Sequence, residues 1–186
     1  METLKITSPI DEKIIKDMKT GTKVLISGTI YTARDAAHLK MIQSLEKGEK
    51  LPFDIRGQTI YYMGPSPARP GHVIGSAGPT TSSRMDGYTP QLLSKGLRAI
   101  IGKGNRSSEV IQALKKYNAV YLVTFGGAGA LISKCIKKAE VIAYPELAAE
   151  AVMRLKIEDL PAIVANDIYG NDMYATGRAA YRKTEV

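Results

Sequence analysis

The sequence predicts an α/β domain with a mixed sheet, and two patterns lead to this class. Residues 22–31 alternate apolar and polar side chains, as a half-buried strand does. In the second half, helical segments alternate with four continuous apolar runs, at 97–101, 119–124, 140–143 and 161–165. Such runs are typical of strands that are buried on both faces of a largely parallel sheet. We therefore expect a mixed sheet whose second half is largely parallel.

The first half is expected to be rich in strands and irregular loops. Gly28, inside the first strand, indicates a β-bulge or a close backbone approach. A helix is expected from Asp35, acting as its N-cap, through Leu45, with Gly48 ending it. Two short strands should flank a loop rich in proline and glycine, with the strands at 59–63 and 73–77 and the loop at 64–71.

Three further helices are expected in the second half. One covers residues 107–117, the next runs from a glycine-rich turn at 126–129 through Ile136, and the last has Pro145 near its first position and extends through Leu155. The tail after Gly170 is polar and should lie on the surface.

Composition restricts the class of protein. The 186 residues carry 26 Lys and Arg against 18 Asp and Glu, a net charge of +8, with 44% hydrophobic residues. These values are ordinary for one soluble domain over residues 1–186. The cations are scattered and tryptophan is absent, so nucleic-acid binding has no support. No apolar run approaches the length of a membrane span, and the N-terminal residues lack a secretion signal. We expect a cytoplasmic protein.

Two loops predict a site for a small, oxygen-rich anion. Residues 78–84 (GPTTSSR) place four hydroxyls beside Arg84, which can bind a carboxylate through two parallel hydrogen bonds. Residues 102–108 (GKGNRSS) lie between an apolar strand and a helix N-terminus, where α/β proteins bind anions. The plainer alternatives are a turn whose hydroxyls satisfy their own backbone and an ordinary strand-to-helix turn with a capping serine.

Other candidates are weaker. The glycines at 126–129 do not match a dinucleotide-binding loop, and they favour close helix packing or a backbone contact with a partner's ligand. His38 could pair with Asp35 or lie on the helix surface, and His72 has less support still. No catalytic triad, Walker loop or cluster of metal ligands is present, and the single Cys135 cannot hold a metal cluster alone. The residues look like half of an active site.

Six segments in order resemble the β subunit, or C-terminal domain, of class I iron–sulfur fumarate hydratases and the related tartrate dehydratases. They are YTARDAAH, AGPTTSSRMD, GKGNRS, FGGAGA, AYPELAAEA and NDxxGND, beginning at residues 31, 77, 102, 125, 143 and 166. The resemblance implies a swivelling β/β/α domain. It also implies a separate α subunit, whose three cysteines hold a [4Fe–4S] cluster with one iron open to substrate.

The resemblance assigns roles by position. It implies that Arg34, Arg84 and Lys103 bind the substrate carboxylates and that Thr80 takes part in proton transfer. A free threonine hydroxyl is a poor base, so that role requires a perturbed environment or a relay. Residues expected to hold these groups in place are Asp35, Thr81, Asn105 and Arg106.

The implied activity is a hydro-lyase reaction, the reversible hydration of fumarate to L-malate, with the site shared between this chain and the α subunit. The GKGNR form resembles the fumarate branch more than the tartrate branch. The alternatives are the β subunit of an L-tartrate dehydratase, a dehydratase of a related dicarboxylate such as mesaconate, and a non-enzymatic anion-binding module.

Overall fold

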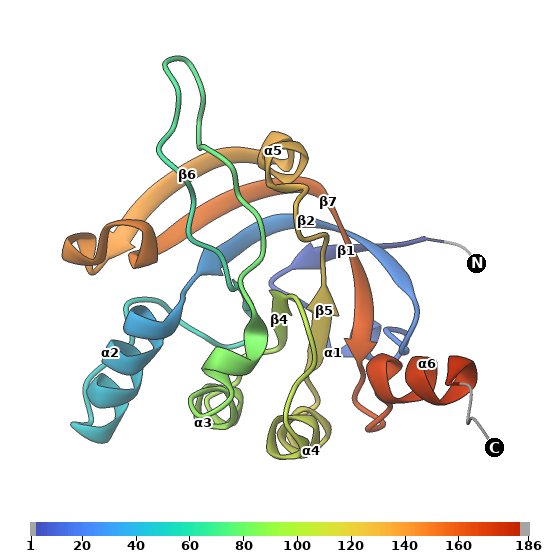
Figure 1. The fold of residues 1–186 in the computed structure, drawn as a ribbon. Coiled ribbons are helices and arrows are strands. Elements are labelled where there is room, and N and C mark those ends of the chain that lie inside the picture. The colour runs from blue at the N-terminus through green and yellow to red at the C-terminus, as the bar shows by residue number, and fades with distance from the viewer. Residues whose placement is uncertain (1–2, 183–186) are drawn as a thin grey trace.

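The computed structural model describes residues 3–182 and shows a mixed α/β fold around a small closed barrel (Figure 1). The strands are β1 (Leu4–Ser8), β2 (Lys23–Thr32), β3 (Thr59–Tyr61), β4 (Ala99–Gly102), β5 (Val120–Val123), β6 (Ile136–Ala143) and β7 (Val152–Asn166). The α-helices are α1 (Glu12–Ile15), α2 (Asp35–Glu46), α3 (Thr89–Ser94), α4 (Ser108–Lys116), α5 (Gly129–Ile132) and α6 (Met173–Tyr181). Short 3₁₀ helices are η1 (Ser82–Met85), η2 (Ser133–Cys135) and η3 (Pro145–Glu150).

The barrel is closed by β7. Strands β1 to β5 pair in sequence order, and all four of these pairings are parallel. The long strand β7 then pairs antiparallel with both β5 and β2, which closes a ring of β2, β3, β4, β5 and β7. Strand β6 adds to β7 outside this ring, and in Figure 1 the two arch together over one side of the barrel.

Strand β2 confirms the alternating pattern of the sequence. Buried and half-exposed residues alternate from Lys23 to Thr32, and the register against β7 shifts between Ile26 and Gly28, as at a β-bulge. A Cβ atom on Gly28 would lie 2.3 Å from the carbonyl oxygen of Ser8, so β1 can approach only a glycine here. Of the two alternatives expected for Gly28, the close backbone approach is confirmed, and it coincides with a shift of register.

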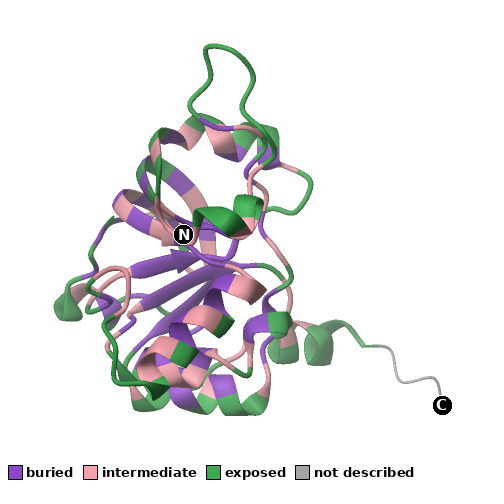
Figure 2. Cartoon of the chain, turned by 90° about the vertical axis from the view of Figure 1, so that its left-hand side faces the viewer, coloured by how far each residue is buried: buried purple, intermediate pink, exposed green. Residues whose placement is uncertain are grey.

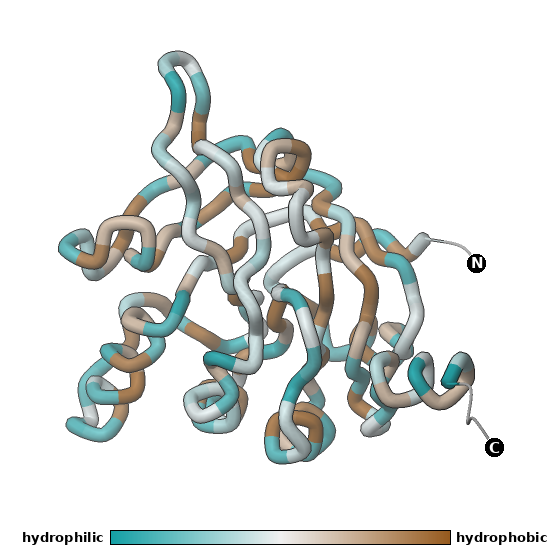
Figure 3. Tube along the Cα trace, in the orientation of Figure 1, coloured by the Kyte–Doolittle hydropathy of each residue, from teal (hydrophilic) through white to brown (hydrophobic). Residues whose placement is uncertain are grey.

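Two apolar cores lie on opposite faces of the strands. The inner core gathers side chains from all five barrel strands, including Ile30, Tyr61, Ile101, Leu122 and Leu155. The outer core packs the opposite faces of β3, β4 and β5 against α2, α3 and α4, which lie side by side beneath the strands in Figure 1. Strands β3, β4 and β5 are buried throughout. In Figure 2 the tip of the projecting loop is exposed, and in Figure 3 β4 and β5 carry hydrophobic segments.

The expected strand at 73–77 is wrong. These residues form one arm of the long loop that projects between β3 and η1, the cyan-green hairpin of Figure 1. Ser66 and Ser76 bond across it, with Ser66 N–H donating to the Ser76 carbonyl at 3.1 Å. The prolines and glycines on both arms remove donors and side chains that a ladder requires, so pairing does not continue.

The expected helix from 145 to 155 is also wrong. Helix η3 ends at Glu150, because Ala148 has φ 51° and ψ −114°, a conformation that no helix continues. Residues 154–157 alternate exposed and buried positions, and residues 152–157 belong to β7. Likewise α5 and η2 stop at Cys135, since Ile136 starts β6 opposite Ile157. The last two strands are therefore antiparallel, and the parallel pairing expected of the second half is confined to β1–β5.

Two helix assignments are confirmed. Helix α4 begins after Ser107, whose hydroxyl caps it by accepting from Val110 N–H at 3.4 Å. Helix α2 covers the expected residues, but its N-cap is Arg34, not Asp35. The carboxylate of Asp35 pairs instead with the side chain of Arg84. Within residues 3–182 no helix combines the length and apolar character needed to cross a membrane.

Candidate functional site

The candidate residues meet at one edge of the barrel. Strands β2, β3, β4 and β5 are mutually parallel, so the loops that follow them leave from the same side. The loop after β2 carries Arg34 and Asp35, and the loop after β4 carries Lys103 and Arg106. This edge is where open α/β proteins place ligands.

The threonine-rich loop docks onto the same edge. The backbone of Thr80 donates to the Tyr62 carbonyl at 2.7 Å, and Thr81 pairs with Lys103 as a parallel β-bridge. Ser82 N–H donates to the Lys103 carbonyl at 2.9 Å, while the Ser82 hydroxyl accepts from Lys103 N–H at 3.1 Å. The Ser82 hydroxyl thus joins two loops, contrary to a turn that satisfies only itself.

Two glycines allow this close docking. A Cβ on Gly102 would lie 1.9 Å from the Ser82 hydroxyl oxygen. A Cβ on Gly129 would lie 2.3 Å from the Ser76 hydroxyl oxygen and 2.8 Å from the backbone nitrogen of Gly78. The glycine-rich turn after β5 therefore serves close packing, as the sequence favours, although the partner is the loop at 76–78 and not the sheet.

Arg106 is the buried centre that ties the loops together. Its side chain has no exposed surface, and its Nε donates to Asp86 at 2.7 Å while Nη2 donates to the Thr89 hydroxyl at 2.8 Å. The guanidinium lies between the rings of Tyr62 and Tyr121, with centroids 5.4 and 4.9 Å away. Burial alone would lower the pKa of Arg106, but these two tyrosines and Asp86 raise it overall, so the charge is retained.

The two candidate carboxylate-binding arginines are both paired with carboxylates of this chain. Arg84 donates from Nε to one oxygen of Asp35 at 2.8 Å, and its Nη2 lies 2.8 Å from the other oxygen. Arg34 places Nη2 3.4 Å from Glu150, and its Nη1 lies near the backbone of Gly64. Each guanidinium keeps further N–H groups for a ligand, because an arginine carries five.

Lys103, Asn105, Thr81 and Thr80 complete the candidate set. The Lys103 side chain is exposed and lies along Gly126, where a Cβ would be 3.5 Å from its Cδ. Thr81 and Asn105 line a hollow of about 310 Å³ next to the start of α4. Thr80 is half-buried. The structure thus brings Asp35 to Arg84 and Thr81 to Lys103, whereas Arg34 is paired with a residue that sequence reasoning did not single out.

His38 is not on the helix surface. It is fully buried in α2, with Nδ1 2.8 Å from the Arg34 carbonyl oxygen and its ring edge against Tyr62. Burial lowers the pKa of His38 to about 4; the nearby charge of Arg106 acts in the same direction, and the Arg34 carbonyl and Asp35 oppose it. We therefore describe His38 as a neutral core residue. It does not pair directly with Asp35.

This burial predicts a specific pH dependence of stability. An unfolded histidine binds its proton near pH 6.5, so between pH 6.5 and 4 the unfolded state binds more protons than the folded state. The free energy of unfolding should therefore fall as the pH falls through this window, by roughly 2 to 3 kcal/mol at pH 4.5. Urea denaturation at pH 7 and 4.5 measures this, with His38→Gln as the comparison. Equal losses in both proteins would contradict the assignment.

Sequence reasoning missed several residues that build the site. Ser82 and Asp86 lie inside segments already noted, and their roles depend on contacts with the loop after β4. Glu150 is 116 residues from Arg34 in the chain, and the segment AYPELAAEA that contains it does not indicate its pairing with Arg34. Tyr62 and Tyr121 read as ordinary strand residues.

The part of the chain that the structure describes does not group the ligands that a metal cluster requires. Within residues 3–182 no three His, Cys, Asp or Glu side chains are grouped so that they could hold a metal ion. Burial raises the pKa of the Cys135 thiol, which disfavours the thiolate that ligates iron.

Comparison with known proteins gives the family. The family described as "Fumarase C-terminus" matches residues 1–177. The chain belongs to this family. Fumarate hydratase 2 of Leishmania major is 42% identical over 171 residues, which are 90% of this chain and 30% of that protein. The aerobic class I fumarate hydratase of Escherichia coli K12 is 42% identical over 156 residues, 83% of this chain and 28% of that enzyme.

A relative of similar length also exists. A protein of Methanocaldococcus jannaschii, described as a proposed L(+)-tartrate dehydratase subunit beta, is 39% identical over 171 residues, 89% of this chain and 88% of that protein. The chain thus spans less than a third of the length of the two fumarate hydratases but nearly all of this subunit. The family resemblance noted in the sequence is confirmed.

Proposed function

We propose that this chain, as one domain, is the β subunit of an iron–sulfur hydro-lyase that hydrates fumarate to L-malate reversibly. The observation that carries the proposal is the meeting of Arg34, Arg84 and Lys103 at the edge formed by the carboxyl ends of the parallel strands. A dicarboxylate requires two cationic positions, and planar arginines suit carboxylates. The family membership supplies the reaction class.

The cluster of such an enzyme belongs, in this proposal, to a partner α subunit, because the described residues of this chain do not fit it. When present, it would supply the Lewis acid that activates the substrate hydroxyl. Exposed apolar side chains flank the site, including Phe125 at 50% and Leu131 at 65% exposure. We propose that this surface contacts the partner, as the subunit beta of the tartrate relative suggests.

The residues of this chain have defined tasks in the proposal. Arg34, Arg84 and Lys103 hold the two carboxylates, and their charges stabilise the negative charge that develops when the C3 proton of malate leaves. Thr80 lies on the docked loop beside Lys103 and is proposed to take part in that proton transfer through a relay. Asp35, Thr81, Asn105 and Arg106 hold these groups in place. A closing motion of the domain around substrate is part of the same proposal.

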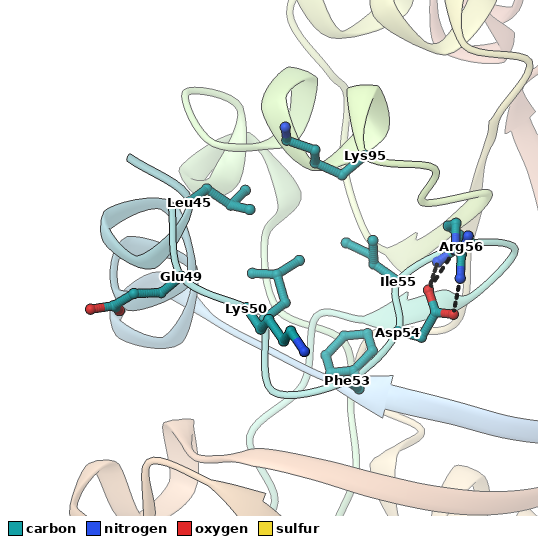
Figure 4. A pocket seen from close by; sticks show the side chains of 9 residues that line it. Leu45, Glu49, Lys50, Phe53, Asp54, Ile55, Arg56 and Lys95 are labelled. Atoms are coloured by element: carbon teal, nitrogen blue, oxygen red, sulfur yellow. Dashed lines mark hydrogen bonds and ion pairs between the residues drawn. The ribbon is translucent and has the colours of Figure 1, made fainter. Parts of the chain in front are cut away.

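The test is fumarate hydration under anaerobic conditions, by this chain with and without a co-expressed cluster-bearing α subunit. We expect activity only in the pair, and Arg84→Ala should lower kcat/KM about 100-fold or more, as the loss of a charge-stabilising donor does. A matched control is Arg56→Ala, because Arg56 is also paired with a carboxylate, Asp54, but lies at a surface hollow away from the site (Figure 4).

Two outcomes would change the conclusion. L(+)-tartrate is the second candidate substrate, since a relative of similar length is described as a proposed L(+)-tartrate dehydratase subunit beta. A pair active on tartrate but not on fumarate would keep the family and replace the substrate. A stable pair with an intact cluster and no activity on either acid would favour an anion-binding module.

A further inference from the structure

We propose that Glu150 is a positioning residue for Arg34, the first arginine of the site. The inference rests on the proposed function for its activity test, but its geometry is independent of the substrate. Glu150 comes from η3, between β6 and β7, whereas Arg34 follows β2. It is a carboxylate that the fold brings to Arg34 from a distant part of the chain.

The two carboxylate oxygens of Glu150 contact two different groups near the start of α2, the side chain of Arg34 and the backbone N–H of Ala36. Oε1 lies 3.4 Å from Arg34 Nη2, and Oε2 accepts a hydrogen bond from Ala36 N–H at 2.9 Å. Helix α2 needs such an acceptor, since its N-cap is Arg34 and makes no side-chain cap. The Glu150 carboxylate therefore caps α2 and also holds the guanidinium of Arg34, the N-cap residue of the same helix. The negative charge also suits the positive end of the helix.

Among the groups around the Arg34 guanidinium, the Glu150 carboxylate is the one placed to fix its orientation. The two side chains are only 21% and 26% exposed, so solvent screens the pair less than it does a fully exposed one. Arg34 Nε is buried and has no hydrogen-bond partner among residues 3–182. Gly64 forms the opposite wall, where a Cβ would lie 2.7 Å from Nη1 and 2.5 Å from the Ala149 carbonyl oxygen.

The turn that carries Glu150 is fixed on both sides. Lys40 of α2 pairs with Glu146 at the start of the turn. At its end, Met153 N–H donates to the Thr32 hydroxyl at 3.1 Å. Between them Ala148 holds a sparsely populated conformation, with φ 51° and ψ −114°. Such a conformation persists only where the surrounding structure enforces it. Here it directs the turn so that the Glu150 carboxylate lies next to Arg34.

A double-mutant cycle in the assembled enzyme tests the inference. Glu150→Gln keeps an oxygen for Ala36 N–H but removes the charge that faces Arg34. We expect it to raise KM for fumarate about 5- to 10-fold with a smaller change in kcat, and to have no further effect in an Arg34→Ala background. Glu146→Gln is the matched control, because it loosens the same turn without touching Arg34. Additive effects, or an equal loss in the control, would overturn the inference.

A second readout does not depend on activity. Phenylglyoxal modifies accessible arginine side chains, and peptide mass spectrometry reports the rate at Arg34. The rate should rise several-fold in Glu150→Gln and stay unchanged in Glu146→Gln. An unchanged rate in Glu150→Gln would overturn the positioning role. If the wild-type pair neither hydrates fumarate nor dehydrates L(+)-tartrate, the proposed function fails, and the labelling rates still decide the role of Glu150.

Discussion

Replacing Arg106 with methionine should lower the free energy of unfolding by about 3 to 5 kcal/mol, the usual cost of removing one partner from a buried ion pair. Asp86 would keep its charge while losing its guanidinium partner, and the Thr89 hydroxyl would lose a donor. The stacking on Tyr62 and Tyr121 would also be lost. Against the 5 to 15 kcal/mol that hold a typical domain folded, this change approaches unfolding.

Two further variants separate the causes. Asp86→Asn added to Arg106→Met removes the unpaired charge and should recover part of the stability, while its amide oxygen can still accept from Ser107 N–H. Arg56→Met removes an exposed arginine that is also paired with an aspartate, and should change nothing measurable. Urea denaturation of the four proteins measures all of this. A loss below about 1 kcal/mol for Arg106→Met would contradict the buried-centre description.

Gly102→Ala should lower both the stability of the protein and the activity of the site. The added Cβ would lie 1.9 Å from the Ser82 hydroxyl oxygen, so Ser82 must move and release its bonds to Lys103 and Tyr121. We expect a loss of about 1 to 3 kcal/mol from overpacking. In the assembled enzyme the displaced Lys103 and Thr80 loops should also lower kcat/KM about 10- to 100-fold, as small misplacements of catalytic groups do.

A second substitution at Ser82 should restore part of the stability that Gly102→Ala removes, because the clash is with the Ser82 hydroxyl oxygen. Ser82→Ala removes the oxygen and leaves the Ser82 Cβ 3.3 Å from the new methyl, a tight contact but one that small shifts relieve. The double variant should therefore be more stable than the sum of the two single losses predicts. Gly87→Ala is the neutral comparison, because nothing lies within 4 Å of its added Cβ and its φ is not positive. Strict additivity would show that Ser82 is not the obstacle.

The parts of the fold that local patterns determine could be predicted. Alternation along β2, the Ser107 cap of α4 and the bulge at Gly28 each depend on neighbours in sequence. The errors arose where distant pairing decided the outcome. The segment after Pro145 has helical residues, but Ala148 leaves the helical region and β7 pairs with β2 and β6 instead. Residues 153–158 (MRLKIE) already alternate apolar and polar side chains in the sequence, so a period-2 test there would have indicated a strand.

In the candidate site, too, some features could be predicted from the sequence and others depend on contacts between distant segments. Loops that follow parallel strands must share an edge, so the meeting of Arg34 and Lys103 at one edge follows from topology. What each arginine touches does not follow from topology. Asp35 reads as a helix cap and proves to be the partner of Arg84, and nothing in the segment around Glu150 indicates that it pairs with Arg34. Side-chain pairing across loops depends on the packing of elements that are far apart in sequence.

The closure of the barrel by β7 also has a consequence for how the protein is made. Strand β7 pairs Thr32 with Met153 and Lys23 with Ile163, contacts that span more than a hundred residues. Such contacts form slowly, because a long loop must be ordered before they form. While the chain emerges from the ribosome, β2 and β5 must wait with open edges until residue 166 is available. The arginine loops therefore reach their final places only after β7 has been synthesised, and chains that stop before β7 should aggregate instead of retaining a weak anion-binding site.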